Sequence, residues 1–288
     1  MGSGLRHRRQ PSRAGRKSAP KGVKLKRLIV NADDFGFTRD VNAGIVEAHR
    51  HGILTATTLM ANGDAFDDAV ALARSNPTLD IGCHVVLVQG RSVLDPARTL
   101  PPTVGGLIRA LLRREIPVCE EVAAQVRKLM CAGIRPSHID THKHTHLLPP
   151  VLEAVARAAR EFGIPWVRRP FDFGIDSRAK VMTAAIAVGM RALRPGFASA
   201  LRGLRTTDHF TGFQLTGTLD VQSLHETLLV LPEGTTEFMC HPGRCGPELR
   251  QATTRLKESR EIELAALLTP DVRRTIRQRG IELVNYLR

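Results

Sequence analysis

The sequence is poor in aromatic residues and in cysteine, and both shortages narrow the range of functions. Aromatic side chains make up 4% of the 288 residues, with one Trp and one Tyr, so few rings are present to stack against a long glycan or against nucleic-acid bases. The cysteines are odd in number and do not form a dense disulfide framework, which is typical of reduced thiols in the cytosol. They are Cys83, Cys119, Cys131, Cys240 and Cys245.

The sequence also lacks a hydrophobic run of 18 residues, and its first 26 residues lack acidic side chains. No membrane-spanning helix is expected, and the twin arginines near the N-terminus are not followed by the apolar region of an export signal. Residues 1–26 contain nine Lys or Arg, so most of the formal charge of +14 is concentrated there. We expect residues 1–25 to form a disordered basic tail with at most weak membrane-surface contact, and the protein to be cytoplasmic.

The rest of the chain alternates short apolar runs with helical patterns, which predicts one α/β domain over 26–288. The expected strands are 26–32, 56–61, 79–87, 137–140, 165–169, 236–240 and 281–287. The expected helices are 38–52, 64–75, 104–114, 119–132, 149–163, 178–194, 220–230 and two between 255 and 280. About seven parallel strands with helical crossovers favour a barrel over an open sheet. We expect residues 171–217 to be an insertion or a lid.

Reactive side chains lie in the last part of four of the expected strands or directly after them, where the active site of a β/α fold is usually found. They are Asp33 and Asp34, His84, Asp140 with His142, His144 and His146, and finally His241. Taken alone, a histidine of this kind is usually a hydrogen-bonded core residue, and neighbouring acids are usually caps or solvated groups. Four such strand ends in one chain indicate a common site.

Acids and imidazoles in this arrangement predict a hydrolytic metal centre. Two imidazoles and one carboxylate leave coordination positions open for a water molecule and a substrate oxygen. A second carboxylate can then accept the proton of the water, which gives two adjacent aspartates different roles. Because neighbouring strand residues point to opposite sides, a turn or bulge after Ala32 must direct both into the cleft, and Gly36 favours it. The three alternate histidines are expected in a loop outside the core, where one is a ligand and the others orient it or contact substrate.

Five motifs in this order resemble the YdjC-like carbohydrate deacetylases, also called the ChbG/HpnK family. The motifs are LIVNADDFG, GILTATTLMANGDAFDDAV, IGCHVVL, SHIDTHKHTHLLPPVLEAVARAA and EFMCHPG. The resemblance spans about residues 26–288. It implies a distorted TIM-like (β/α) barrel related to polysaccharide deacetylases, and hydrolysis of the acetamide of an N-acetylated sugar with one divalent metal ion.

The resemblance also implies roles for individual residues. Asp34, His84 and His142 match the metal ligands, and Asp33 matches the general base. His241 matches a histidine that protonates the leaving amine or stabilises the oxyanion. The remaining polar residues of the fourth motif are expected next to the ligands or on the sugar: Asp140, His144 and His146. The segment HVVLVQG departs from the family pattern, and residues 171–217 have no clear counterpart.

The substrate and the metal stay open at this stage. ChbG-like members deacetylate chitin disaccharides, whereas HpnK-like members act on N-acetylglucosaminyl hopanoids at a membrane. The shortage of aromatic rings favours a short oligosaccharide over a polymer. The ligand types accept Mg²⁺ or Zn²⁺, and also Co²⁺ or Mn²⁺. The family also suggests a homodimer.

Two other functions fit parts of the sequence. A zinc-dependent nucleic-acid binder could use Cys240, His241 and Cys245 as ligands and the basic tail on phosphate, but no second ligand pair has structural-zinc spacing and no recognition motif is present. A metal-dependent phosphoesterase could use the same ligands as a deacetylase. It would lack both a glycine-rich phosphate loop and a second carboxylate group for a two-metal site.

Overall fold

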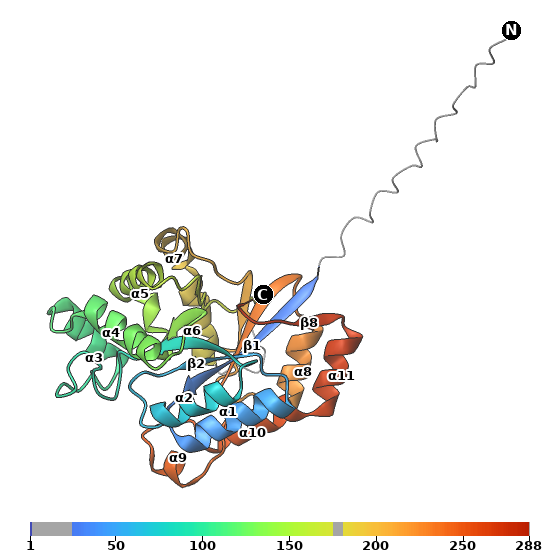
Figure 1. The fold of residues 1–288 in the computed structure, drawn as a ribbon, viewed down its shortest axis with the longest axis horizontal. Helices are drawn as coiled ribbons and strands as arrows, with labels where there is room; N and C mark the ends of the chain where they lie inside the picture. Colours follow the sequence, from blue (N-terminus) through green and yellow to red (C-terminus); the bar gives the residue numbers. More distant parts are fainter. Residues whose placement is uncertain (2–24, 175–180, 288) are drawn as a thin grey trace.

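All strands in the described residues belong to one parallel sheet. The computed structural model describes residues 1, 25–174 and 181–287. The strands run in the order β5-β4-β3-β2-β1-β7-β6, and β8 pairs with β1 outside this path (Figure 1). Their bounds are β1 (Lys26–Phe35), β2 (Ala56–Leu59), β3 (Asp80–Val85), β4 (His138–Thr141), β5 (Trp166–Val167), β6 (His209–Thr211), β7 (Gly234–Cys240) and β8 (Ile281–Leu283).

The sheet curls into a distorted barrel, which confirms the expected fold class. Its two edges, β5 and β6, meet through single parallel bridges, Trp166 with Arg205 and Asp172 with Phe210. Such isolated bridges are weaker than the continuous pairing between the other strands, so the barrel is least regular at this seam. Because all strands are parallel, their carboxyl ends lie at one end of the barrel, where side chains from distant parts of the sequence meet.

Helices surround the curved sheet (Figure 1). They are α1 (Arg39–His51), α2 (Phe66–Ser75), α3 (Val104–Leu112), α4 (Val118–Cys131), the 3₁₀ helix η1 (His142–Leu147), α5 (Pro149–Glu161), α6 (Val181–Arg191), α7 (Arg194–Ala200), α8 (Val221–Leu229), α9 (Pro247–Gln251), α10 (Glu258–Leu268) and α11 (Pro270–Gln278). Among the described residues, no helix is both long and apolar enough to cross a membrane.

The central strand β1 separates an apolar layer from the barrel interior. Leu28 and Val30 belong to the large cluster beneath the helices, whereas Ile29 packs in a second cluster with Trp166 and Tyr286. Side chains alternate between the two faces of a strand, so Asn31 and Asp33 share the interior face with Ile29. The aromatic cluster fills one end of the interior, and polar side chains fill the other.

Several expected elements differ in the structure. The helix expected over 178–194 corresponds to α6 within the described residues and ends at Arg191, and residues 178–180 lie outside the described residues. The next helix, α7, was not expected; it begins at Arg194 and has Pro195 in its first turn. Strand β6 and helix α9 were not expected, since both are too short to give a periodic pattern. The helix expected over 64–75 begins at Phe66, after Ala65 and without a side-chain cap, so the expected start at Asp64 was wrong.

The seam of the barrel contains a buried carboxyl group whose contribution to stability depends on pH. Asp172 accepts hydrogen bonds from the backbone of Phe213 and from Gln214, at 2.9–3.3 Å. Burial nevertheless raises the pKa of Asp172 from 3.8 to about 6. Because this pKa is higher in the folded than in the unfolded chain, the stabilisation is complete below about pH 4 and is lost as the pH rises through 6.

Replacing this carboxyl group should therefore change the pH dependence of stability. As the pH rises from 4 to 7, the free energy of unfolding of the wild type should fall by about 3 kcal/mol more than that of Asp172→Asn, because asparagine does not ionise. The measurement is the free energy of unfolding of both proteins, from urea denaturation at the two pH values. A difference between the two proteins that is the same at both pH values would contradict the prediction.

Candidate metal centre

The carboxyl end of β1 is irregular, and the irregularity brings two adjacent carboxylates into the same site. The pairing of β1 with β2 shifts register between Ala32 and Phe35. Asp34 has a φ of 69°, and Gly36 has a φ of 90°. The amide of Gly36 donates to the side chain of Asn42 in α1 at 2.6 Å, which holds the turn. The expected bulge after Ala32 is therefore present, and it allows Asp33 and Asp34 to lie on the same side of the strand, in one site.

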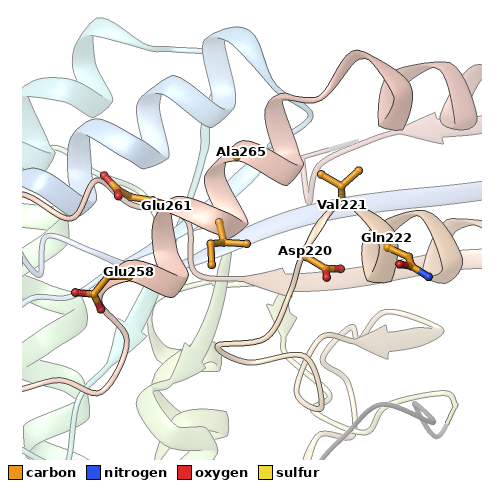
Figure 2. A pocket seen from close by; sticks show the side chains of 7 residues that line it. Asp220, Val221, Gln222, Glu258, Glu261 and Ala265 are labelled. Atoms are coloured by element: carbon orange, nitrogen blue, oxygen red, sulfur yellow. The ribbon is translucent and has the colours of Figure 1, made fainter.

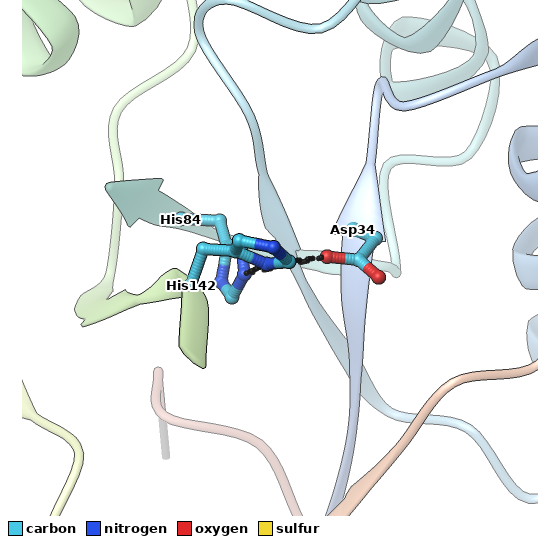
Figure 3. Close-up of side chains that lie close together, drawn as sticks. All are labelled: Asp34, His84 and His142. Carbon is cyan, nitrogen blue, oxygen red and sulfur yellow. Dashed lines mark hydrogen bonds and ion pairs between the residues drawn. The ribbon is translucent and has the colours of Figure 1, made fainter. Parts of the chain in front are cut away.

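Asp34, His84 and His142 converge from three different segments (Figure 3). Asp34 Oδ1 lies 3.4 Å from His84 Nε2 and 3.3 Å from His142 Nδ1, and the two nitrogens are 3.4 Å apart. Three ligand atoms around a tetrahedral ion with bonds of about 2.0–2.1 Å are separated by roughly 3.3 Å. The three atoms thus have the spacing of a ligand set.

The bonding of Asp34 leaves one oxygen free for a cation. Asp34 Oδ1 is buried and accepts no hydrogen bond within the described part of the chain, whereas Oδ2 accepts one from Arg260 at 2.5 Å. Burial raises the pKa of Asp34, but Arg260 and the nearby imidazoles of His142 and His84 outweigh this and hold the pKa well below its usual range. A buried, ionised oxygen without a donor is costly unless a cation satisfies it.

His84 is oriented by a carboxylate on the neighbouring strand. Its Nδ1 lies 2.7 Å from Asp140 Oδ1, which leaves Nε2 facing Asp34. Metal-binding histidines usually have such a partner on the second ring nitrogen. Burial lowers the pKa of His84, but Asp140 together with Asp33 and Asp34 raises it to about 10. The negative charge around this imidazole therefore favours a cation at the site.

A buried arginine that the sequence analysis missed holds Asp33. Arg168, just after β5, donates from both terminal nitrogens to Asp33 at 2.7 and 2.8 Å, and it also pairs with Asp140 at 2.5 Å and Glu237 at 2.6 Å. Burial raises the pKa of Asp33, but Arg168 and His84 lower it well below its usual range. The rule that located the other residues, a polar side chain at a strand end, also applies to Arg168 in the segment WVRRP.

These pairings distinguish two candidate ligand groups in the described residues. Asp33, His84 and Asp140 also lie close enough together to hold an ion. In that group, however, the carboxylates already bind Arg168, and Asp140 also contacts His84. The group with Asp34 and His142 contains the oxygen that lacks a partner, so it is the better cation site.

His241, directly after β7, lies beside Asp33. Its Nε2 is 4.0 Å from Asp33 Oδ2, and its Nδ1 is buried without a hydrogen-bond partner among the described residues. Its backbone amide donates to Glu263 of α10 at 2.5 Å. Burial is the main cause that lowers the pKa of His241 to about 4. The imidazole is thus neutral near pH 7 and lies beside an ionised carboxylate.

The remaining histidines of the fourth motif are buried, which differs from the expected exposed loop. They lie in η1, where Lys143 and His144 have left-handed backbone angles, so the three histidines do not alternate along an extended chain. His146 contacts the Thr141 hydroxyl at 2.7 Å and the carbonyl of Arg168 at 3.2 Å. His144 packs edge-on against Phe210 and Phe213. Burial lowers the pKa of His146 to about 3.

Two other features lie apart from this centre. Cys240 donates to the carbonyl of Asn31, and Cys240, His241 and Cys245 are not among the metal-capable groups of the described residues. The zinc-binding alternative therefore has no structural support.

A surface groove between α8 and α10 is lined by Asp220, Val221, Gln222, Glu258, Glu261, Ile262 and Ala265 (Figure 2).

Comparison with known proteins identifies the family. The family model described as YdjC-like protein matches residues 27–278. A protein of Brevibacillus brevis named carbohydrate deacetylase is 33% identical over 267 residues, covering 90% of this chain and 98% of the relative. One of Clostridium beijerinckii with the same name is 31% identical over 265 residues, with the same coverage.

A solved structure is also similar over nearly the whole chain. It is described as a putative cellobiose-phosphate cleavage protein from Enterococcus faecalis, with a TM-score of 0.72 and 27% identity, covering 91% of this chain and 98% of that one. Residues 27–278, which the family model matches, contain every residue of the centre described above. The chain belongs to the YdjC-like family, whose curated relatives include carbohydrate deacetylases.

Proposed function

We propose that the protein is a metal-dependent hydrolase that removes the acetyl group from a short N-acetylated amino sugar, such as a chitooligosaccharide. The names of the relatives support the reaction class. The observation that carries the proposal is the triangle of Asp34 Oδ1, His84 Nε2 and His142 Nδ1, with one unsatisfied oxygen, next to Asp33 and His241.

In this proposal the three ligand residues hold one divalent cation. When bound, such an ion polarises the acetyl carbonyl and makes water a stronger nucleophile. Asp140 keeps the ring of His84 in place, and Arg168 keeps Asp33 ionised and fixed. Asp33 accepts the proton of the attacking water. His241 is neutral and lies 4.0 Å from Asp33, so it can take up the proton that Asp33 has accepted and then donate it to the leaving amine nitrogen, or it can stabilise the oxyanion through its N–H group.

The proposal predicts acetate release that depends on a metal. Purified protein should release acetate from di-N-acetylchitobiose, lose at least 90% of this activity (roughly one order of magnitude) after treatment with a chelator, and regain it with Zn²⁺, Co²⁺ or Mg²⁺. Acetate is measured by a coupled enzymatic assay, and metal content by mass spectrometry. Undiminished activity in protein shown to be metal-free would contradict the metal requirement.

A glycolipid deacetylase is the second candidate, favoured by the surface of α6. This helix follows β5 in the chain, and its Ile186 and Val188 are each 48% exposed. An exposed apolar helix surface suits a substrate with a lipid at a membrane. Acetate release from an N-acetylglucosaminyl lipid in detergent, but not from the disaccharide, would favour this candidate. Release from neither substrate would count against both.

A further inference from the structure

Helix α10, one of the helices around the barrel, contributes a buried arginine, Arg260, that contacts the candidate metal centre. Arg260 and Glu263 lie on the same helix face as Leu264 and Leu267, and all four are at most 2% exposed. Charged residues on the apolar face of a helix are rare unless they have a specific partner. Glu263 accepts the amide of His241, which attaches α10 to the segment after β7. Arg260 reaches further, to Asp34.

The contact between Arg260 and Asp34 gives the two carboxylate oxygens of Asp34 different partners. Arg260 Nη2 donates to Oδ2 at 2.5 Å, and Oδ1 faces His84 and His142. An ionised carboxylate rotates between orientations unless one oxygen is held, and hydrogen bonds to a ligating carboxylate affect metal affinity. With Oδ2 fixed, Asp34 offers Oδ1 to a cation and cannot turn away from it.

The path of Arg260 is kept open by a glycine in the HPG motif. A Cβ on Gly243 would lie 3.1 Å from the Cδ of Arg260, and the amide of Gly243 donates to the carbonyl of Arg260 at 3.2 Å. The other donors of this arginine are only partly satisfied, since Nε donates to the carbonyl of Leu256 at 3.3 Å but Nη1 is buried without a hydrogen-bond partner within the described part of the chain. An arrangement that costs stability in this way is typical of a functional role.

We propose that Arg260 is a positioning residue of the metal centre, which orients Asp34 so that Oδ1 completes the ligand set with His84 and His142. This inference rests on the proposed metal centre, but not on the identity of the sugar. It assigns a role in metal binding to a helix that carries none of the ligands.

The test is Co²⁺ binding by the full chain, followed by visible absorption. Arg260→Ala should bind Co²⁺ about 10- to 100-fold more weakly than the wild type and with an altered spectrum. Arg260→Lys should lose less affinity, since an ammonium restores the charge but not the planar fork of donors. Added guanidinium at low millimolar concentration should restore part of the affinity of Arg260→Ala, and urea of the same concentration should not. Glu258→Gln, at an exposed position of α10, is the control.

The outcomes separate positioning from general damage. Folded Arg260→Ala with wild-type Co²⁺ affinity would overturn the inference, and so would a loss of affinity that guanidinium leaves unchanged. If Arg260→Ala does not fold, Gly243→Ala keeps the arginine but displaces it, and it should also weaken Co²⁺ binding; unchanged binding would overturn the inference. Because the probe is the metal alone, a wild type that binds Co²⁺ but releases no acetate would refute the proposed substrate and still leave Arg260 tested.

Discussion

Asp33→Asn should lower kcat for deacetylation by about 10²- to 10⁴-fold, the scale of general-base catalysis, while metal binding persists. The asparagine has the same shape, so it can still contact Arg168, but it cannot accept the proton of the attacking water. Asp34, His84 and His142 are unchanged, so the ligand set remains complete. The measurement is kcat by acetate release, with metal content determined on the same sample.

The control for this prediction must exclude a folding defect. Asp33 is buried and ion-paired, so its replacement leaves Arg168 with two carboxylates, Asp140 and Glu237. Asp67→Asn, at an exposed position of α2, provides a matched change of charge with no expected effect. A folded, metal-containing Asp33→Asn that keeps its activity within tenfold would exclude Asp33 as the base.

His142→Ala should lose metal binding and activity together. His142 offers Nδ1 to the same point as Asp34 and His84, so its removal leaves two ligands from the protein. Changes to residues that merely support a ligand cost roughly 10- to 100-fold in affinity, and loss of a ligand should cost at least as much. The measurements are the Co²⁺ or Zn²⁺ dissociation constant and acetate release at saturating metal.

This variant is preferable to a change at His84. The side chain of His142 is 23% exposed, whereas that of His84 is 1% exposed, so loss of His142 should disturb folding less. His51→Ala, at the exposed end of α1, is the control. Wild-type metal affinity in His142→Ala would show that the ion is held by other groups, with Asp33, His84 and Asp140 as the next candidates.

The fold could be predicted from the local pattern of apolar and polar residues, because this pattern is clear in the long helices and in the buried strands. Helices such as α1 and α5 have an apolar face with recognisable ends, and the buried strands are continuous apolar runs. The short elements escaped prediction: β6 has three residues and α9 has five, so neither completes a period. The burial of His144 and His146 also escaped prediction, because the left-handed backbone at Lys143 and His144 that forms η1 has no pattern in the sequence.

The sequence by itself determined which residue types could bind a metal and at which strand ends they lie. The parallel strands predicted that these side chains gather at one end of the barrel, and the family resemblance matched Asp34, His84 and His142 to the metal ligands. The structure brings the candidate ligand atoms of the three residues within 3.4 Å of one another.

Only the tertiary structure decided how the two aspartates differ. Asp33 forms an ion pair with Arg168, which lies just after β5. Asp34 accepts a hydrogen bond from Arg260 of α10, 226 residues away in the sequence. No local pattern encodes such contacts, because they depend on how distant elements pack and on which oxygen of each carboxylate is already satisfied.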